Sequence, residues 1–258
     1  MEPTVAELLL LTTVALTAGI VDAIAGGGGL LTLPALLATG LPPHLALGTN
    51  KGQSVFGSGA ALVRYSRSSM VEGSRALIAF PAGLAGSLLG ASLVMRLRPE
   101  SLRPLVLVLL IAVAAFLAFR PQVQGRKRES SARRTRLVAA STGLLIGAYD
   151  GFFGPGTGTF LIIAFVLLLG EELARASANA KVVNFASNLA AMALFASRDA
   201  IVWKLAVPMA AAQLAGGWLG AHFTVRRGDR LVRGVVLAVV LALSVKLGSE
   251  VLGLGAVP

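Results

Sequence analysis

The chain has 258 residues, of which 55% are hydrophobic, 14% are charged and none is cysteine, and its formal net charge is +11. A soluble domain of this size carries about 25% charged residues, whereas apolar segments of about 20 residues match the hydrocarbon core of a bilayer. The composition therefore excludes an ordinary soluble globule and predicts an all-α integral membrane protein. The lack of cysteine excludes a disulfide framework and a thiolate metal site, and we expect no metal and no cofactor.

The basic residues lie mainly in the short connections between apolar segments. No aromatic platform is interleaved with them and no nucleic-acid-binding motif is present, so we expect no nucleic-acid partner. Cytoplasmic loops of membrane proteins are enriched in lysine and arginine, which explains the excess more simply. The lipid bilayer is therefore the expected partner of the chain.

Ten apolar segments follow one another, five on each side of a basic linker. The residues before the first segment lack a basic region, so we interpret this segment as a retained helix and not as a signal peptide. The linker holds seven lysines and arginines and one glutamate, which predicts a cytoplasmic loop. We expect a first membrane repeat at 1–119, the linker at 120–136 and a second repeat at 137–258. The segments are Val5–Ala25, Leu30–Leu47, Asn50–Tyr65, Ala76–Leu97, Leu102–Phe119, Leu137–Phe153, Thr157–Leu169, Ala176–Ala196, Ile201–Val225 and Val232–Leu252.

An internal repeat relates the two halves. Gly19–Gly26 matches Gly147–Gly154, and Ala85–Ala91 matches Ala215–Ala221. The offset between Ala85 and Ala215 also relates Lys51 to Lys181. It relates two pairs of arginines as well, Arg96 with Arg226 and Arg103 with Arg233. If each half crosses the membrane an odd number of times, the second half is inverted relative to the first. Five full crossings would do this, and so would three crossings plus a re-entrant pair formed by the first two segments. We therefore predict inverted repeats. With the linker inside, the basic loop Arg226–Arg233 also lies inside, as the charge rule prefers, but the matching loop Arg96–Arg103 lies outside despite its three arginines.

The second segment of each half is short or broken and follows a glycine-rich loop. Pro34 and Gly40 interrupt the first of these segments, and Gly170 ends the other. Irregular backbone at membrane depth survives only where protein or a watery cavity satisfies it, so broken or re-entrant helices are expected here. Free N–H groups of such loops can bind an anion, although the same loops could simply be tight turns between packed helices. The candidate substrate-binding residues are Gly26, Gly27, Gly28, Gly29, Gly154, Gly156, Thr157 and Gly158.

Polar side chains recur at helical spacing in the third segment of each half, which indicates one polar face per helix. A lysine within an apolar span is a functional candidate, but a lysine near the membrane interface could instead extend to the headgroups. Asp22 and Asp150 are the candidate partners, which could neutralise the lysines, accept a coupling proton or cap the glycine loops. The further candidate substrate-binding residues are Asn50, Lys51, Gln53, Ser54, Lys181, Asn184 and Asn188.

Other residues are assigned to packing or stay ambiguous. The glycine pairs Gly86/Gly90 and Gly216/Gly220 predict close helix contacts. Gln213 lies in an apolar span, where it either lines the transport path or makes a hydrogen bond between helices. The two histidines have no carboxylate or nucleophile at a catalytic spacing, so we interpret both as structural.

Together these motifs resemble the TauE/SafE family, also called the sulfite exporter or toluene-sulfonate uptake permease family. The resemblance rests on Gly19–Gly29 and Leu41–Lys51 in the first half, and on Tyr149–Gly158 and Asn184–Asn188 in the second. It covers nearly the whole chain, the linker being its least characteristic part. It implies a multi-pass permease of the inner (plasma) membrane for sulfite, sulfoacetate or other organosulfonates, and leaves the direction of transport open.

The expected function is therefore secondary transport of a small anion by alternating access at a site between the two repeats. A sulfonate offers three acceptor oxygens and one negative charge to loop N–H groups, amide side chains and a lysine. A passive anion channel is an alternative, and an intramembrane enzyme is a weaker one, because no nucleophile–base pair is recognisable. We expect no enzymatic activity, and leave open a homodimer as well as the coupling ion.

Overall fold

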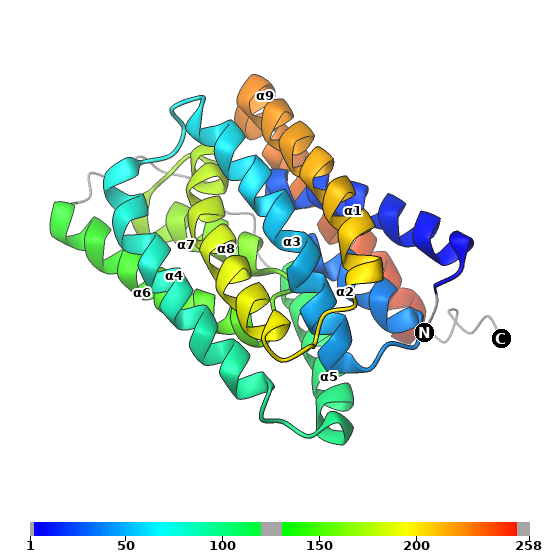
Figure 1. Ribbon diagram of the computed structural model, residues 1–258. Coiled ribbons are helices and arrows are strands. Elements are labelled where there is room, and N and C mark those ends of the chain that lie inside the picture. The colour runs from blue at the N-terminus through cyan, green and yellow to red at the C-terminus, as the bar shows by residue number, and fades with distance from the viewer. Residues whose placement is uncertain (1–2, 120–130, 252–258) are drawn as a thin grey trace.

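The computed structural model describes residues 3–119 and 131–251, and all regular secondary structure in these ranges is helical. The chain is therefore all-α, as predicted. The helices are α1 (Val5–Ala25), α2 (Gly29–Ala38), α3 (Pro43–Ser66), α4 (Gly73–Val94), α5 (Pro99–Phe119), α6 (Ala132–Phe152), α7 (Thr157–Leu169), α8 (Leu173–Ala196) and α9 (Trp203–Val251) (Figure 1).

Three of the described helices, α1, α4 and α5, are long and apolar enough to cross a membrane by length and composition. Their outward faces carry large apolar side chains, among them Leu77, which is 80% exposed, and Val5, which is 74% exposed. Such a surface is unfavourable in water and suits lipid. The equally long α3 and α8 are less apolar because they carry the polar side chains of the interior, and most of the residues of α8 are buried. The chain is a helical membrane protein.

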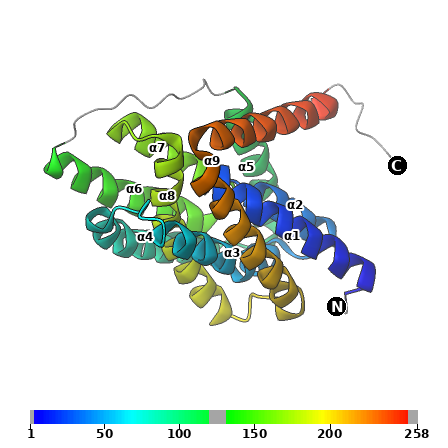
Figure 2. The same ribbon diagram turned by 90° about the horizontal axis from the view of Figure 1, so that it is seen from above.

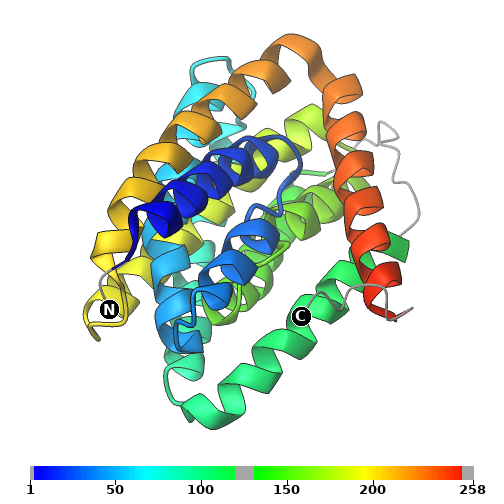
Figure 3. The same ribbon diagram turned by 90° about the vertical axis from the view of Figure 1, so that its right-hand side faces the viewer.

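Helix α9 bends sharply at Gly228 (Figure 3), whose backbone angles are φ 59° and ψ −149°. A positive φ of this kind is readily adopted by glycine. The bend divides α9 into residues 203–227 and 229–251, which correspond to the ninth and tenth apolar segments of the sequence. The connection between these segments is therefore a kink at Gly228 where two helices meet, and the last residue of the tenth segment, Leu252, lies outside the described residues.

The structure corrects two other predicted boundaries. Helix α2 runs through Pro34 and ends at Ala38, and α3 already begins at Pro43, so the predicted segment Leu30–Leu47 is wrong. Gly40, with φ 80°, breaks the chain between them, and proline is favourable in the first turn of α3. Helix α6 begins at Ala132, inside the stretch expected to be linker, because Ser131 caps its first turn. The rest of the linker, 120–130, lies outside the described residues.

The same turn ends α3 and α8. Ser69 and Asp199 are the two non-glycine residues with positive φ in the described ranges, at 53° and 49°. In each case the chain then turns back, with the amide of Met70 or Ala200 donating to the carbonyl of Tyr65 or Phe195. These positions correspond in the internal repeat. The two turns lie at opposite ends of the molecule, above and below in Figure 1.

The two halves are intertwined and form two bundles (Figure 2). Residues 203–227 of α9 pack on α1 and α3, with α2 alongside, and we call this group the first bundle. Helix α4 packs on α6 and α8, with α7 alongside, and we call this group the second bundle. Each half thus contributes its first three helices to one bundle and its fourth helix to the other.

Glycine contacts hold the fourth helix of each half against the first helix of the other half. Gly90 of α4 lies against the carbonyl oxygen of Ala148 in α6, and Gly220 of α9 lies against that of Ile20 in α1. Gly86 and Gly216 make the equivalent contacts one turn earlier. The assignment of these four glycines to helix packing is confirmed.

Candidate functional site

The glycine loops before α2 and α7 meet in the interior, at the boundary between the two bundles. With 10 and 13 residues, α2 and α7 are about 15 and 20 Å long, too short to cross a hydrocarbon core of about 30 Å. Gly26, with φ 71°, lies directly against the backbone of Gly158, and a side chain at either position would clash with the other loop. The absence of side chains is thus what lets the N-terminal ends of both short helices reach one place.

These helix ends present backbone N–H groups that have no protein acceptor. Gly28 precedes α2, and Gly156, with φ 86°, precedes α7 in a left-handed conformation. Within the described ranges, the N–H groups of Gly29 and Gly158, in the first turns of α2 and α7, donate to no backbone or side-chain acceptor. Unpaired donors at a helix N-terminus, with the positive end of its dipole, favour an anion.

Two buried ion pairs cross the boundary between the bundles next to these loops. The ammonium of Lys51 in α3 lies 2.7 Å from Oδ1 of Asp150 in α6. The ammonium of Lys181 in α8 lies 2.7 Å from Oδ2 of Asp22 in α1. Each lysine therefore pairs with the aspartate of the opposite half, and neither extends to a membrane surface, since both are almost fully buried.

The two aspartates have unequal surroundings. The Asp150 side chain is 2% exposed and also accepts hydrogen bonds from the hydroxyls of Thr157, at 2.9 Å, and of Ser187. The Asp22 side chain is 19% exposed and, besides Lys181, accepts a longer bond of 3.3 Å from the amide of Gly28. Asp150 thus has three side-chain partners, whereas Asp22 has one side-chain partner and one backbone partner and is more exposed.

Asparagines complete the polar layer. Lys51 also donates to Asn188 at 3.1 Å, and Lys181 to Asn184 at 3.3 Å. Asn50 accepts hydrogen bonds from Thr32 of α2 at 2.6 Å and from Gln53 at 3.0 Å. The buried polar groups are therefore mostly satisfied by one another, as a network inside an apolar protein has to be.

A narrow polar cavity of about 20 Å³ lies among these groups. This volume holds about one water molecule, and it is far below that of sites for organic ligands. The site as described therefore has no room for an anion larger than water. The lining residues are Asp22, Gly27, Gly28, Gly29, Asn50, Lys51, Ser54, Asp150, Gly154, Gly156, Thr157, Gly158, Asn184, Asn188 and Gln213.

Most of the residues selected from the sequence lie at this cavity, and three do not. Gly26 forms the contact between the loops, Gln53 supports Asn50 from behind, and Lys181 reaches the site through Asp22 and Asn184. Gln213, for which the sequence left two roles open, lines the cavity from the second half. Thr32 and Ser187 were not selected, although the position of Ser187 three residues after Asn184 places it on the same helix face.

Fold and site together define a helical membrane protein with two broken helices that meet at a buried polar site, an arrangement typical of secondary transporters. The chain belongs to the sulfite exporter TauE/SafE family, whose model matches residues 11–247. This assignment confirms the family resemblance noted in the sequence.

Several bacterial relatives match over nearly their whole length. A probable membrane transporter protein of Haemophilus influenzae is 38% identical over 93% of this chain and 94% of its own. The probable membrane transporter protein ORF9 of Sinorhizobium is 37% identical over 93% and 92%, and YfcA of Escherichia coli is 37% identical over 93% and 90%. No solved structure matches the chain significantly.

Proposed function

We propose that this chain is a multi-pass permease of the inner membrane that transports a small sulfur-containing anion, such as sulfite, sulfoacetate or another organosulfonate, by alternating access. The observation that carries this proposal is the cavity between the N-terminal ends of α2 and α7, where unpaired N–H groups lie beside Lys51 and several amide side chains, with Lys181 behind Asp22 and Asn184. A sulfonate or sulfite group offers several acceptor oxygens and negative charge to these donors.

The moving parts in this proposal are the two bundles. Both ion pairs and the contact between Gly26 and Gly158 cross the boundary between the bundles, so any opening that admits an anion has to loosen these contacts. Repeats 1–119 and 137–258, joined by a cytoplasmic linker, would be inverted, which makes opening toward either side of the membrane structurally equivalent. The corresponding turns at opposite ends of the molecule support this arrangement.

Charge balance suggests where the anion and a coupling ion exchange. The two lysines and two aspartates carry no net charge together, so an anion has to compete with a carboxylate for a lysine. Asp22 has fewer partners than Asp150 and more exposure, which favours the Asp22–Lys181 pair as the one that opens. A proton on Asp22 would release Lys181 to the anion and couple one proton to one anion.

A passive anion channel is the second candidate. A channel needs a continuous path in its conducting state, whereas the described conformation leaves room for about one water at the site. The closed cavity between two movable bundles favours alternating access.

The test is the binding of sulfite and of sulfoacetate to the purified full chain, with neutral substitutions that leave both ion pairs intact. We expect saturable binding by the wild type and a loss of affinity of about tenfold or more in Asn188→Ala and Thr157→Val, because each removes a polar partner of the site. Counterflow in proteoliposomes then separates transport from binding.

Asn179→Ala is the matched control for this experiment. Asn179 lies on α8 like Asn188 and is equally buried, but it donates to Glu171 at the end of the helix, away from the cavity. We expect it to bind the anion like the wild type. The proposal is overturned if the wild type binds neither anion, or if Asn188→Ala and Thr157→Val bind as tightly as Asn179→Ala.

A further inference from the structure

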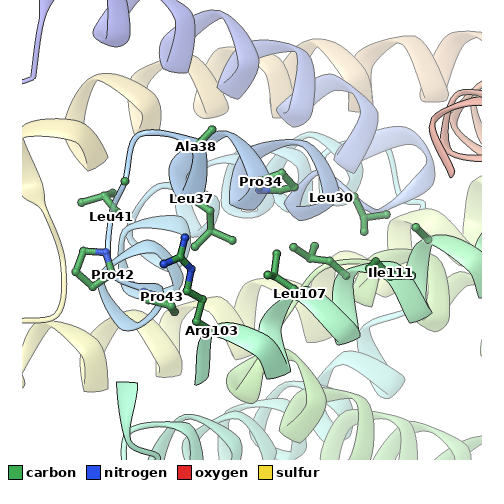
Figure 4. Close-up of a pocket in the computed structure, with 13 residues that line it drawn as sticks. Leu30, Pro34, Leu37, Ala38, Leu41, Pro42, Pro43, Arg103, Leu107 and Ile111 are labelled. Atoms are coloured by element: carbon green, nitrogen blue, oxygen red, sulfur yellow. The ribbon is translucent and has the colours of Figure 1, made fainter. Parts of the chain in front are cut away.

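A second, much larger cavity lies on the outer side of α2. It has a volume of about 620 Å³ and opens between α2, the turn before α3, and α5. In Figure 4 the side chains of Leu37 and Pro34 face those of Leu107 and Ile111 across it, and Arg103 points into one end. Apart from Arg103, every side chain that lines it is apolar. The transport site uses the N-terminal end of α2, so this cleft is a separate space.

The cleft has a cationic end and an apolar length. Its lining residues on α5 are Arg103, Leu107, Leu110, Ile111 and Ala114, which share one face of the helix. Arg103 lies in the second turn of α5, close to the end of a membrane span that begins at Pro99. Since a helix rises about 1.5 Å per residue, the apolar wall extends about 16 Å from Arg103 toward the middle of the membrane. A charge at the level of the headgroups and an apolar groove below it fit a lipid.

Arg103 has no partner of its own. Within the described ranges its guanidinium makes no ion pair and no hydrogen bond, although Glu100 lies one turn away on the same helix. Helix α5 is also the least buried of the three apolar spans, and Figure 3 shows it at the edge of the molecule. The cleft therefore faces the bilayer, where the available anion at this depth is a lipid phosphate.

We propose that this cleft binds one anionic phospholipid, with its headgroup on Arg103 and an acyl chain between α2 and α5. The bound acyl chain would support α2 on the side that faces α5, because Leu30 at the inner end of the cleft directly follows Gly29 of the transport site. The lipid thereby fills the space into which α2 would otherwise shift.

The test uses the purified full chain in detergent, with phosphatidylglycerol as the anionic lipid and phosphatidylcholine as the neutral one. Native mass spectrometry counts the bound lipids and gives their affinity. We expect one tightly held phosphatidylglycerol, about fivefold weaker binding in Arg103→Gln, and unchanged binding in Arg98→Gln, an exposed arginine that directly precedes α5 and does not line the cleft.

Filling the cleft gives an independent variant. Ala114→Phe places a ring inside it and should displace the lipid, whereas Ala112→Phe, on the exposed face of the same helix, should not. The proposal is overturned if phosphatidylcholine binds as tightly as phosphatidylglycerol, or if neither Arg103→Gln nor Ala114→Phe weakens binding. A change of oligomeric state in Ala114→Phe with lipid binding unchanged would also overturn it, and would identify the cleft as an interface between copies.

Discussion

Lys51 and Lys181 each hold an aspartate at 2.7 Å, but the two ion pairs are not equivalent. Asp150 is buried and accepts two hydroxyl hydrogen bonds besides its lysine, whereas Asp22 is partly exposed and accepts a backbone amide. Removing one partner of a buried pair leaves an uncompensated charge, which is strongly destabilising. The repeated sequence thus produces two ion pairs with different surroundings. The Lys51–Asp150 pair is suited to hold the bundles together, and the Lys181–Asp22 pair is suited to exchange its carboxylate for an anion.

Substitution of the two aspartates should separate these roles. Asp150→Asn should lower the free energy of unfolding by about 3–5 kcal/mol, because Lys51 stays buried without a counter-ion. Asp22→Asn should destabilise the protein less, because the Asp22 carboxylate is more exposed and has fewer partners, and it should strengthen anion binding, because no carboxylate then competes for Lys181. Denaturant unfolding and organosulfonate binding measure the two effects.

Among the described residues, few charged groups face Asp22. Lys181 is its ion-pair partner in the described ranges, and the hydroxyl of Tyr65 donates to the neighbouring carbonyl of Ala23. An organosulfonate is the suitable probe because its sulfonate group stays ionised. Equal destabilisation by both substitutions, or weaker anion binding in Asp22→Asn than in the wild type, would contradict this division of roles.

The sequence predicted these residues but not their pairing. Helical spacing placed Lys51 on a polar face, and the matching position of Lys181 repeated it. Which aspartate each lysine contacts depends on how α1, α3, α6 and α8 pack, and local spacing contains no information on that. The inequality of Asp22 and Asp150 depends on Ser187, Thr157 and the loop backbone, so it became visible only in three dimensions.

At the scale of elements, close contact between α4 and α6 depends on glycine. A Cβ at Gly90 would overlap the carbonyl oxygen of Ala148, and the helix backbone cannot move away without separating the helices. Gly90→Ala should therefore lower the free energy of unfolding by about 1–3 kcal/mol, as overpacking does. Thermal unfolding of the purified protein in detergent measures the loss.

Gly73→Ala is the control on the same helix. Nothing lies within 4 Å of a Cβ at Gly73, and its φ is not positive, so the same substitution should leave stability within about 0.5 kcal/mol of the wild type. If Gly90→Ala were as stable as Gly73→Ala, the close approach of α4 and α6 would not depend on the missing side chain.

Segment type was easier to predict from the sequence than segment ends. Hydropathy alone located α1 at Val5–Ala25, because lipid-facing spans are uniformly apolar. It failed after Ala38, because the predicted segment Leu30–Leu47 continues across the break at Gly40 into the first turn of α3. Near Gly228 it located two segments correctly but made their connection too long, because the basic stretch Arg226–Arg233 is helical on both sides of the kink at Gly228.

For the whole molecule, the exchange of the fourth helix between the halves determines which parts can move. Because α4 belongs to the second bundle and residues 203–227 to the first, the two sequence repeats cannot separate as independent bodies. The internal repeat was visible in the sequence as matching motifs. The intertwining was not, because it depends on contacts between helices that are far apart in the chain.

Orientation in the membrane gives the most direct test at this scale. Arg67 and Ser197 occupy corresponding positions at the ends of α3 and α8, both are exposed, and both have ordinary helical φ values of −63° and −66°. Inverted repeats place them on opposite sides of the membrane, as the opposite ends of the molecule in Figure 1 indicate. The chain has no native cysteine, so single variants Arg67→Cys and Ser197→Cys can be labelled without background.

A membrane-impermeant maleimide added to intact cells should label one of these two variants, and the other only after the membrane is permeabilised. The physical reason is that the chain between the two positions crosses the bilayer an odd number of times if each half does. Labelling of the unpermeabilised cells at both positions, or at neither, would mean that the halves are parallel. The two bundles would then lack the symmetry that makes opening toward each side equivalent, and alternating access would need a different moving part.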